Sequence, residues 1–288
     1  MNVEFKKLTQ EELDEKFEQH KIYIAAENKN EVEDKRLDLS NCDLRGLKIA
    51  DEYKNLFIDA NLTGTDFSNR KLESMMFKNC NMERASFYRS YIEDAKFINC
   101  RLVDSNLNRT MVYGVEFTRC NLGCISAHNS YFSHIKCEYV DMHNSDLYQV
   151  KFAYADLTKI SLVGCNLDKS LIYGTDFSQA NITDASFVDS YIKDSNFEYA
   201  ALSRCNFANA SFERTDLRNA DIKNLTLSFG DNNRSNISFD NKQLAYMLKF
   251  ICNMGLEGRS ISNNAKKDII GMMKYIDRLG RRRTIKCK

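Results

Sequence analysis

The sequence has no proline and no tryptophan among its 288 residues. A chain without proline must make its turns with other residues, and a repeated turn built from Asn, Asp and Ser is one way to do so. It also has no run of 18 apolar residues, so no segment reaches the length of a membrane-spanning helix. The first twenty residues are acidic and lack the apolar core of a secretion signal, so we expect a cytoplasmic protein with no membrane partner.

Cysteine is plentiful, with ten residues, but the chain is long and carries no export signal, so we expect free thiols rather than disulfides. The charge is unevenly distributed. Residues 55–227 hold 18 basic and 21 acidic side chains, a net charge of −3, whereas residues 228–288 hold 13 and 5, a net charge of +8. The long middle of the chain is therefore nearly neutral, and the C-terminal segment is basic.

A five-residue period runs through the middle of the chain. Every fifth residue from Phe57 to Leu227 is large and apolar, except Ala127 and Cys137. Two residues before each of them stands a residue that is usually Ala, Cys, Ser or Thr. Neither the helical period of 3.6 nor the strand period of 2 predicts this pattern. A large and a small residue two positions apart both point inward if the chain between them is extended.

Such a chain can close its interior by forming a coil with four sides of five residues. Residue n then lies over residue n+20, about 4.8 Å away, which is the spacing of hydrogen-bonded strands. Aligning the sequence at this period places Phe57, Phe77, Phe97 and Phe117 in one column, where aromatic rings can stack. The sequence therefore predicts an all-β solenoid, a quadrilateral β-helix of nearly nine turns, over residues 37–227.

These residues also resemble a known family. The segments CDLRGL, ANLTGTDF, ADLTKI and SNFEYAALSRCNFANASFERTDLRNADI are similar to pentapeptide-repeat proteins, whose unit is a small residue, Asp or Asn, Leu or Phe, and two variable residues. The resemblance covers residues 37–227 and implies a right-handed β-helix. Some relatives dimerise through their C-terminal ends. Others mimic DNA, bind DNA gyrase or topoisomerase IV and protect against quinolones.

Both ends of the solenoid are expected to be covered by helices. Residues 1–36 form an N-terminal helical cap, in which Thr9 and Glu12 make a capping box that starts a helix over residues 9–28. The apolar face of this helix contains Leu13, Phe17, His20 and Ile24. In residues 228–288, a loop, two helices and a basic tail follow, and the helical hairpin covers the last turn or forms a homodimer interface. The five-residue period slips by three residues near 50–56, which predicts a bulge or small loop projecting from the rod.

Two groups of residues are candidate metal sites. Cys80, Cys100 and Cys120 should stack in one inward column, but a line of thiols cannot surround a zinc ion tetrahedrally. The second group lies where the period is weakest, and we expect a kink or a bulged side there. It consists of Cys124, His128, His134, Cys137 and His143, which should point to different sides of the coil. No sequence motif of a known active site is present. We predict no catalytic, cofactor-binding or metal-binding residues and no enzymatic activity.

The function expected from these features is a non-enzymatic scaffold for protein–protein interaction, with an unknown protein partner. Four tyrosines that directly follow inward residues are candidates for partner contacts, or for strand formation alone: Tyr88, Tyr113, Tyr148 and Tyr173. The alternative is a DNA-mimic modulator of DNA gyrase or topoisomerase, which the nearly neutral repeat region disfavours. Direct binding of DNA by the basic C-terminal segment is a third hypothesis.

Overall fold

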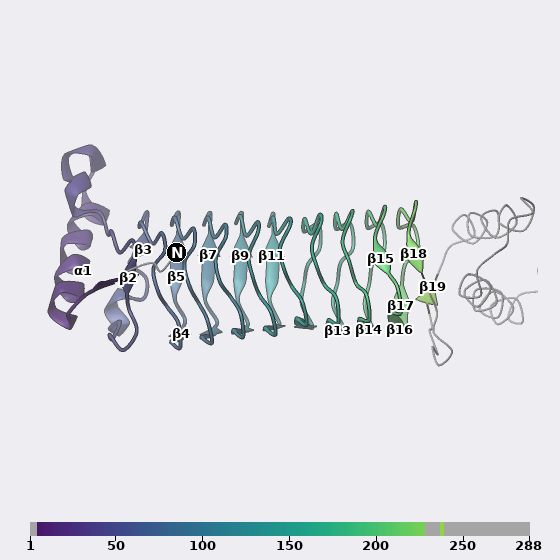
Figure 1. Ribbon diagram of the computed structural model, residues 1–288. Coiled ribbons are helices and arrows are strands. Elements are labelled where there is room, and N and C mark those ends of the chain that lie inside the picture. The colour runs from purple at the N-terminus through teal and green to yellow at the C-terminus, as the bar shows by residue number, and fades with distance from the viewer. Residues whose placement is uncertain (1–4, 228–236, 239–288) are drawn as a thin grey trace, which may run out of the picture.

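The computed structural model describes residues 5–227 and 237–238, which form a rod of stacked coils with helix α1 (Gln10–Ala25) across its N-terminal end (Figure 1). One eight-stranded parallel sheet contributes a strand to each of eight successive coils between residues 71 and 213, so the rod has about eight turns, slightly fewer than the nearly nine expected. The predicted β-solenoid and the N-terminal helix are thus confirmed. The right-handed sense of the coil stays a prediction, and the predicted C-terminal helical hairpin lies outside the described residues.

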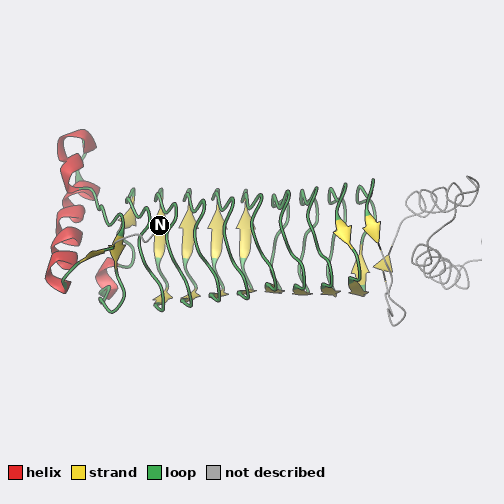
Figure 2. Cartoon of the chain, in the orientation of Figure 1, coloured by secondary structure: helices red, strands yellow, loops and turns green. Residues whose placement is uncertain are grey.

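The strands are two or three residues long and all pair in parallel (Figure 2). The eight-stranded sheet contains β4 (Lys71–Glu73), β6 (Tyr91–Glu93), β8 (Met111–Tyr113), β10 (Tyr131–Ser133), β12 (Lys151–Ala153), β13 (Leu171–Tyr173), β14 (Tyr191–Lys193) and β16 (Ser211–Glu213). A five-stranded sheet contains β3 (Phe57–Ile58), β5 (Met76–Lys78), β7 (Lys96–Ile98), β9 (Glu116–Thr118) and β11 (Lys136–Glu138). The remaining strands are β1 (Lys6–Lys7), β2 (Cys42–Asp43), β15 (Asn206–Phe207), β17 (Thr215–Asp216), β18 (Thr226–Leu227) and β19 (Ile237–Ser238).

The pairing register confirms the period of twenty residues. Phe77 pairs with Phe97 in the five-stranded sheet, and Phe132 pairs with Phe152 in the eight-stranded sheet. Every large residue of the five-residue period from position 57 to position 222 is buried. In the column that begins with Phe57, successive ring centroids lie 4.9, 4.8 and 5.0 Å apart. The core is therefore one continuous column of side chains that follows the axis of the rod.

The residue before each large inward residue influences which form its side of the coil takes. Where it is Asp or Asn, its side chain accepts a hydrogen bond from the backbone N–H two residues later, as Asp66 does from Ser68 at 2.8 Å. This local bond replaces a strand by a turn. In the eight-stranded sheet this position is occupied by Lys, Tyr, Met or Leu in all strands except β16, and extended strands form instead.

The column that begins with Phe57 shows this choice within a single side of the coil. Its first five members lie in strands, the last of which is β11. At the next level Asp156 precedes the large residue and accepts from the N–H of Thr158 at 3.2 Å, and the strand gives way to a turn. Asp176 does the same with Ser178 at 2.8 Å. This residue accounts for the form of most sides, but the sides that begin with Arg101 and Ala201 are turns without such a bond, and Asn206 lies in β15 although it makes one.

The predicted kink between residues 124 and 143 is wrong. Ile125 and Ile135 occupy small inward positions there, while Ala127 and Cys137 occupy large ones, and all four are buried. The register is uninterrupted, with Cys137 paired to Phe117. Exchanging the large and small residues of a pair two positions apart leaves the filled volume nearly unchanged, and cores tolerate such exchanges.

The N-terminal cap uses the predicted capping box. Thr9 accepts from the N–H of Glu12 at 3.1 Å, and the Glu12 carboxylate accepts from the N–H of Thr9 at 2.7 Å. The buried face of α1 consists of Leu13, Phe17, His20 and Tyr23, whereas the predicted Ile24 is only half-buried. Strand β1 pairs with β2 and covers the backbone edge of the first coil, and the 3-10 helix η1 (Lys29–Lys35) returns the chain to the solenoid.

The predicted slip of three residues is present as an insertion in the first coil. Asp43 pairs with Asp66, 23 residues later, whereas the next pair, Asp66 with Ser86, spans 20. The extra residues form the 3-10 helix η2 (Asp51–Tyr53). The loop does not simply project from the rod, because the Tyr53 ring is buried and stacks on Phe17 of α1 at 4.5 Å.

His20 connects α1 to the coil below it. Its side chain is fully buried, its Nδ1 accepts from the N–H of Leu37 at 2.9 Å, and its Nε2 donates to the carbonyl of Ile58 at 2.9 Å. This arrangement requires a neutral imidazole with its proton on Nε2. Burial lowers the pKa of His20 because the charged form would lose its hydration.

The cap should therefore weaken in acid. The pKa of His20 is lower in the folded chain than in the unfolded one, so the unfolded state takes up a proton first, below its pKa of about 6.5. Stability is complete above that pH and falls as the pH decreases toward the folded-state pKa, by at most about 1.4 kcal/mol per pH unit. Hydrogen exchange of α1 amides between pH 7.5 and 5 measures this loss. In a His20→Gln variant, whose amide can make both bonds without titrating, the loss should disappear; an unchanged pH dependence would contradict the assignment.

Candidate interaction surface

The predicted column of cysteines forms part of the core. The thiols of Cys80, Cys100 and Cys120 are buried and donate to backbone carbonyls of the coil below, at 3.1, 3.3 and 3.2 Å. Burial raises the pKa of Cys165 and of Cys205, which fill the same kind of position, to about 12. Such thiols stay protonated, and only the thiolate is a nucleophile or a metal ligand.

The second group of candidate ligands is not brought together. Cys137 points into the core, and Cys124 is exposed at a corner. Two of the imidazoles each contact a different carboxylate: His143 contacts Asp141 at 2.8 Å, and His128 contacts Asp146 at 2.5 Å. His134 lies on a different side, over the eight-stranded sheet. Within the described residues, no three His, Cys, Asp or Glu side chains are placed to hold a metal ion.

Exposed aromatic and apolar side chains gather on the outer surface of the eight-stranded sheet. We call this surface the aromatic face; it consists of Met111, Tyr113, Tyr131, His134, Lys151, Tyr154, Leu171 and Tyr173. Tyr154 is 64% exposed, Met111 50%, Tyr113 43% and Leu171 41%. The other large apolar side chains exposed in the described part of the chain, Ile22, Tyr139 and Tyr199, lie away from this sheet. A grouped apolar surface of this kind is typical of interaction sites, whereas scattered residues are not.

The rings of the aromatic face contact one another. His134 lies between Tyr113 and Tyr154, with ring centroids 5.2 and 5.4 Å away. Tyr154 also lies over Gly174, where an added Cβ would come within 2.7 Å of the ring. Below the rings, Ser133 and Ala153 are small and almost completely buried. Mutual contacts restrict the rings before any partner arrives, which lowers the entropic cost of binding.

A single cation stands at the centre of this surface. The Lys151 ammonium lies 4.9 Å from the Tyr131 ring centroid and 5.8 Å from that of Tyr173. Among the described residues it has no carboxylate within ion-pair distance, unlike Lys71 and Lys193 on the same sheet, which pair with Glu73 and Glu213. A cation held over aromatic rings without a counter-charge can accept a carboxylate or a further ring from a partner.

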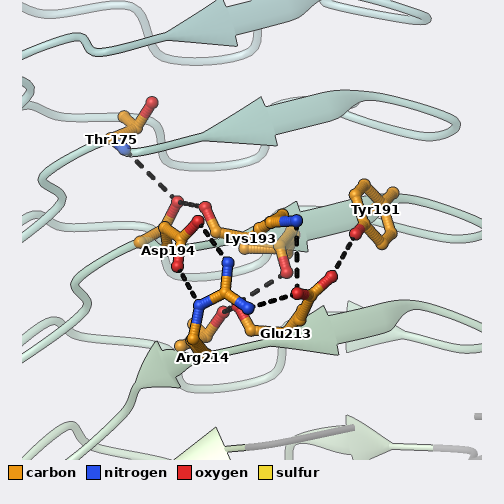
Figure 3. Close-up of polar contacts among 9 residues, drawn as sticks. Thr175, Tyr191, Lys193, Asp194, Glu213 and Arg214 are labelled. Carbon is orange, nitrogen blue, oxygen red and sulfur yellow. Dashed lines mark hydrogen bonds and ion pairs between the residues drawn. The ribbon is translucent and has the colours of Figure 1, made fainter. Parts of the chain in front are cut away.

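The C-terminal rim of the sheet is polar. Figure 3 shows the Glu213 carboxylate between three groups: it accepts from Tyr191 at 2.5 Å, pairs with Lys193 at 3.2 Å and contacts Arg214. Arg214 also binds both oxygens of Asp194, at 2.5 and 2.8 Å. The hydrogen bond to Glu213, with burial, raises the pKa of Tyr191 to about 12. An apolar centre with a polar rim is the usual composition of a protein–protein interface.

Part of this surface was predicted from the sequence. Of the four candidate tyrosines, Tyr113 and Tyr173 lie on the aromatic face, whereas Tyr88 and Tyr148 lie on a neighbouring side of the coil. The prediction missed Tyr131, Tyr154 and Lys151. Tyr131 and Lys151 precede a large inward residue, and Tyr154 occupies a corner. The prediction considered only tyrosines that directly follow a large inward residue. The three missed residues would have been found by aligning whole sides of the coil at the twenty-residue period, because the alignment places them beside Tyr113 and Tyr173.

Two family models match the sequence. The model described as "Pentapeptide repeat region" matches residues 71–147, and the model "Pentapeptide repeats (8 copies)" matches residues 160–198 and 195–228. The chain belongs to the pentapeptide-repeat family. Up to residue 227, the matched segments fall within the solenoid. A comparison with curated proteins found no match.

Solved structures of other pentapeptide-repeat proteins are also similar. One is HetL, involved in heterocyst differentiation regulation in the cyanobacterium Nostoc sp., at 20% identity over 66% of this chain and 81% of HetL, with a TM-score of 0.44. Another is QnrB1, a plasmid-mediated fluoroquinolone resistance protein, at 18% identity over 75% of this chain and 96% of that one, with a TM-score of 0.33. A third, from the Arabidopsis thaliana thylakoid lumen, is 14% identical over 79% and 97% of the chains, with a TM-score of 0.23.

Proposed function

We propose that this pentapeptide-repeat protein is a non-enzymatic scaffold that binds a protein partner through its aromatic face. The observation that carries the proposal is the grouping of exposed Tyr, Met, Leu and His side chains around Lys151 on one flat sheet. Tyrosine is enriched at interfaces because it adds a large contact area and loses little rotamer entropy. On the sides that form turns, Asp and Asn side chains are engaged by backbone N–H groups, as at Asp66, Asn106 and Asn121.

An enzymatic role has less support. The described interior is filled by side chains of the five-residue period, and the buried thiols of Cys165 and Cys205 are protonated at neutral pH. None of the helices in the described part of the chain has the length and apolar composition that a bilayer span requires. We take the cytoplasm as the compartment, because the buried unpaired cysteines suit a reducing environment.

The alternative function, a DNA mimic that modulates DNA gyrase or topoisomerase, is disfavoured by charge. B-DNA carries one negative charge per roughly 1.7 Å of its axis, so a mimic on the order of 40 Å long would need about 24. Residues 55–227 have a net charge of −3. Gyrase supercoiling assays with micromolar protein would test this function, and inhibition or protection against a quinolone would support it.

The scaffold proposal is tested with two tyrosines in equivalent positions. Tyr154 and Tyr139 both occupy left-handed corners, with φ of 53° and 55°, and are 64% and 70% exposed, but only Tyr154 lies on the aromatic face. Proteins captured from cell extract by the tagged full chain are identified by mass spectrometry, and the affinity of each for the purified chain is measured. Tyr154→Ser should weaken partner binding by about tenfold or more, as expected for a central interface tyrosine. Tyr139→Ser should leave binding unchanged, and equal effects of the two variants would refute the assigned surface.

A further inference from the structure

The strands of the eight-stranded sheet, each taken with the corner residue that follows it, are arranged as a palindrome. Reading inward from the two ends, the first segment resembles the last, the second resembles the seventh, and so on to the centre, which lies between β10 and β12. The matching segments are YIED (91–94) with YIKD (191–194), MVYG (111–114) with LIYG (171–174), and YFSH (131–134) with KFAY (151–154). The outermost segments, KLES (71–74) and SFER (211–214), are both polar.

This order has a direct geometric consequence for two copies of the sheet. If two rods lie face to face and antiparallel, related by a two-fold axis that passes between β10 and β12, each segment of one copy faces its matching segment in the other. Tyr113 of one copy faces Tyr173 of the other, Met111 faces Leu171, and Gly114 faces Gly174. The apolar centres of the two sheets then overlap completely, and the polar ends meet polar ends.

The charges favour the same arrangement. YIED and YIKD differ at one position, and the differing residues, Glu93 and Lys193, are those that face each other across the two-fold axis. They are opposite in charge, and each interface would contain this pair twice. Glu93 has no ion-pair partner among the described residues of its own chain. A cation from a second copy would therefore give the Glu93 carboxylate an ion-pair partner.

We propose that the aromatic face binds a second copy of this chain, in an antiparallel, face-to-face homodimer centred between β10 and β12. The inference rests on the proposed function, since it names the partner of the same surface. It differs from a dimer formed through the C-terminal helices, because all of its contacts lie between residues 71 and 214. At the centre, Lys151 of each copy faces Tyr131 of the other, which extends the cation–aromatic contact already present within one chain at 4.9 Å.

Like charges also meet in this arrangement, but three of the four carboxylates involved are already paired with a basic side chain of their own chain. Asp94 faces Asp194, whose two oxygens are bound by Arg214. Glu73 faces Glu213; Lys71 pairs with Glu73, and Lys193, which faces Glu93 of the other copy, also pairs with Glu213 of its own chain. Repulsion between compensated surface carboxylates is small.

The size of the surface sets the expected strength. Eight strands at about 4.8 Å, each three residues of about 3.3 Å wide, cover roughly 400 Å² per copy before side chains and corners are counted. The total buried area is then on the order of 1,000 Å², which is at the lower limit for a specific complex. The dimer should therefore be reversible, with a dissociation constant in the micromolar range.

Charge reversal tests the arrangement. Glu93→Lys places two like-charged Lys–Lys pairs in the homodimer, and Lys193→Glu places two Glu–Glu pairs. Each variant of the full chain should dimerise at least about tenfold more weakly than the parent in sedimentation velocity experiments from 1 to 200 µM. When the two variants are mixed, both pairs across the two-fold axis of the mixed dimer again join a lysine to a glutamate. The mixture should therefore recover the affinity of the parent.

Controls separate this inference from the proposed function. Lys78→Glu makes the same charge change on the five-stranded sheet and should not affect dimerisation. A parent chain that stays monomeric at 200 µM, or a dimer insensitive to both reversals, would overturn the inference. If mixing the two variants does not restore the affinity of the parent dimer, the antiparallel register is wrong. If Tyr154→Ser abolishes binding of a different protein while the chain is monomeric, the scaffold function stands and the self-association does not.

Discussion

Replacing Phe97 with alanine should lower the free energy of unfolding by about 3–5 kcal/mol, the usual range for a fully buried phenylalanine. The Phe97 side chain is 1% exposed and stacks on Phe77 and Phe117, with ring centroids 4.8 and 5.0 Å away. It also meets the edge of Phe87 at 6.4 Å. Neighbouring coils are held by backbone hydrogen bonds at fixed spacing, so they cannot collapse into the space left by the ring. Denaturant unfolding followed by circular dichroism measures the loss.

The matched control is a small inward residue on the next side of the same coil. Cys100 is 2% exposed, and its thiol donates to the carbonyl of Phe77 at 3.3 Å. Cys100→Ala removes one sulfur atom and one weak hydrogen bond, so the expected loss is only about 1 kcal/mol. If the two substitutions cost the same, the stacked phenylalanines are not the main source of stability in this part of the rod.

Removing one complete turn should leave a folded, shorter rod, whereas removing a single residue should not. Deleting residues 79–98 takes out twenty residues, so Asn99 takes the place of Asn79 and every inward position keeps its neighbours. Solenoid stability is roughly a sum over turns and their interfaces, so the loss is that of one turn. Deleting Asn79 alone shifts the following side by one residue. Because side chains alternate with a period of two, large apolar residues of that coil would then turn outward.

Only the single deletion changes the register, because the other removes a whole turn, so the comparison tests the period itself. The single deletion should destabilise the rod by about 4 kcal/mol or more, the range of changes that expose buried apolar side chains. Thermal unfolding and far-ultraviolet circular dichroism of both variants give the answer. A twenty-residue deletion that unfolds the chain, or a one-residue deletion that is tolerated, would contradict a period of twenty residues per turn.

The solenoid could be predicted from the sequence because each of its contacts repeats at a constant separation. The column of Phe57, Phe77, Phe97 and Phe117 required only the period. The expected kink near Ala127 and Cys137 was wrong because each inward position was considered alone. What the coil conserves is the summed volume of a large and a small position, and Ile125 and Ile135 compensate for their smaller neighbours.

The aromatic face could be predicted only in part, for a different reason. Tyr113 and Tyr173 were recognised because they follow core residues, but Lys151 and Tyr154 matter through their neighbours in the adjacent coils. From one position in the sequence we can infer only that its side chain points outward. Only the alignment of all eight strands shows that the outward residues form one surface and that its order is palindromic.

By itself, the sequence determined the period of five, the turn of twenty and the capping box of α1. All of these depend on residues close in the chain or at a constant spacing. Only the tertiary structure decided how the cap closes the first coil, where Tyr53 stacks on Phe17 and His20 joins Leu37 to Ile58. Those contacts join segments with no common period, so they depend on the shape of the packed end rather than on any repeated spacing.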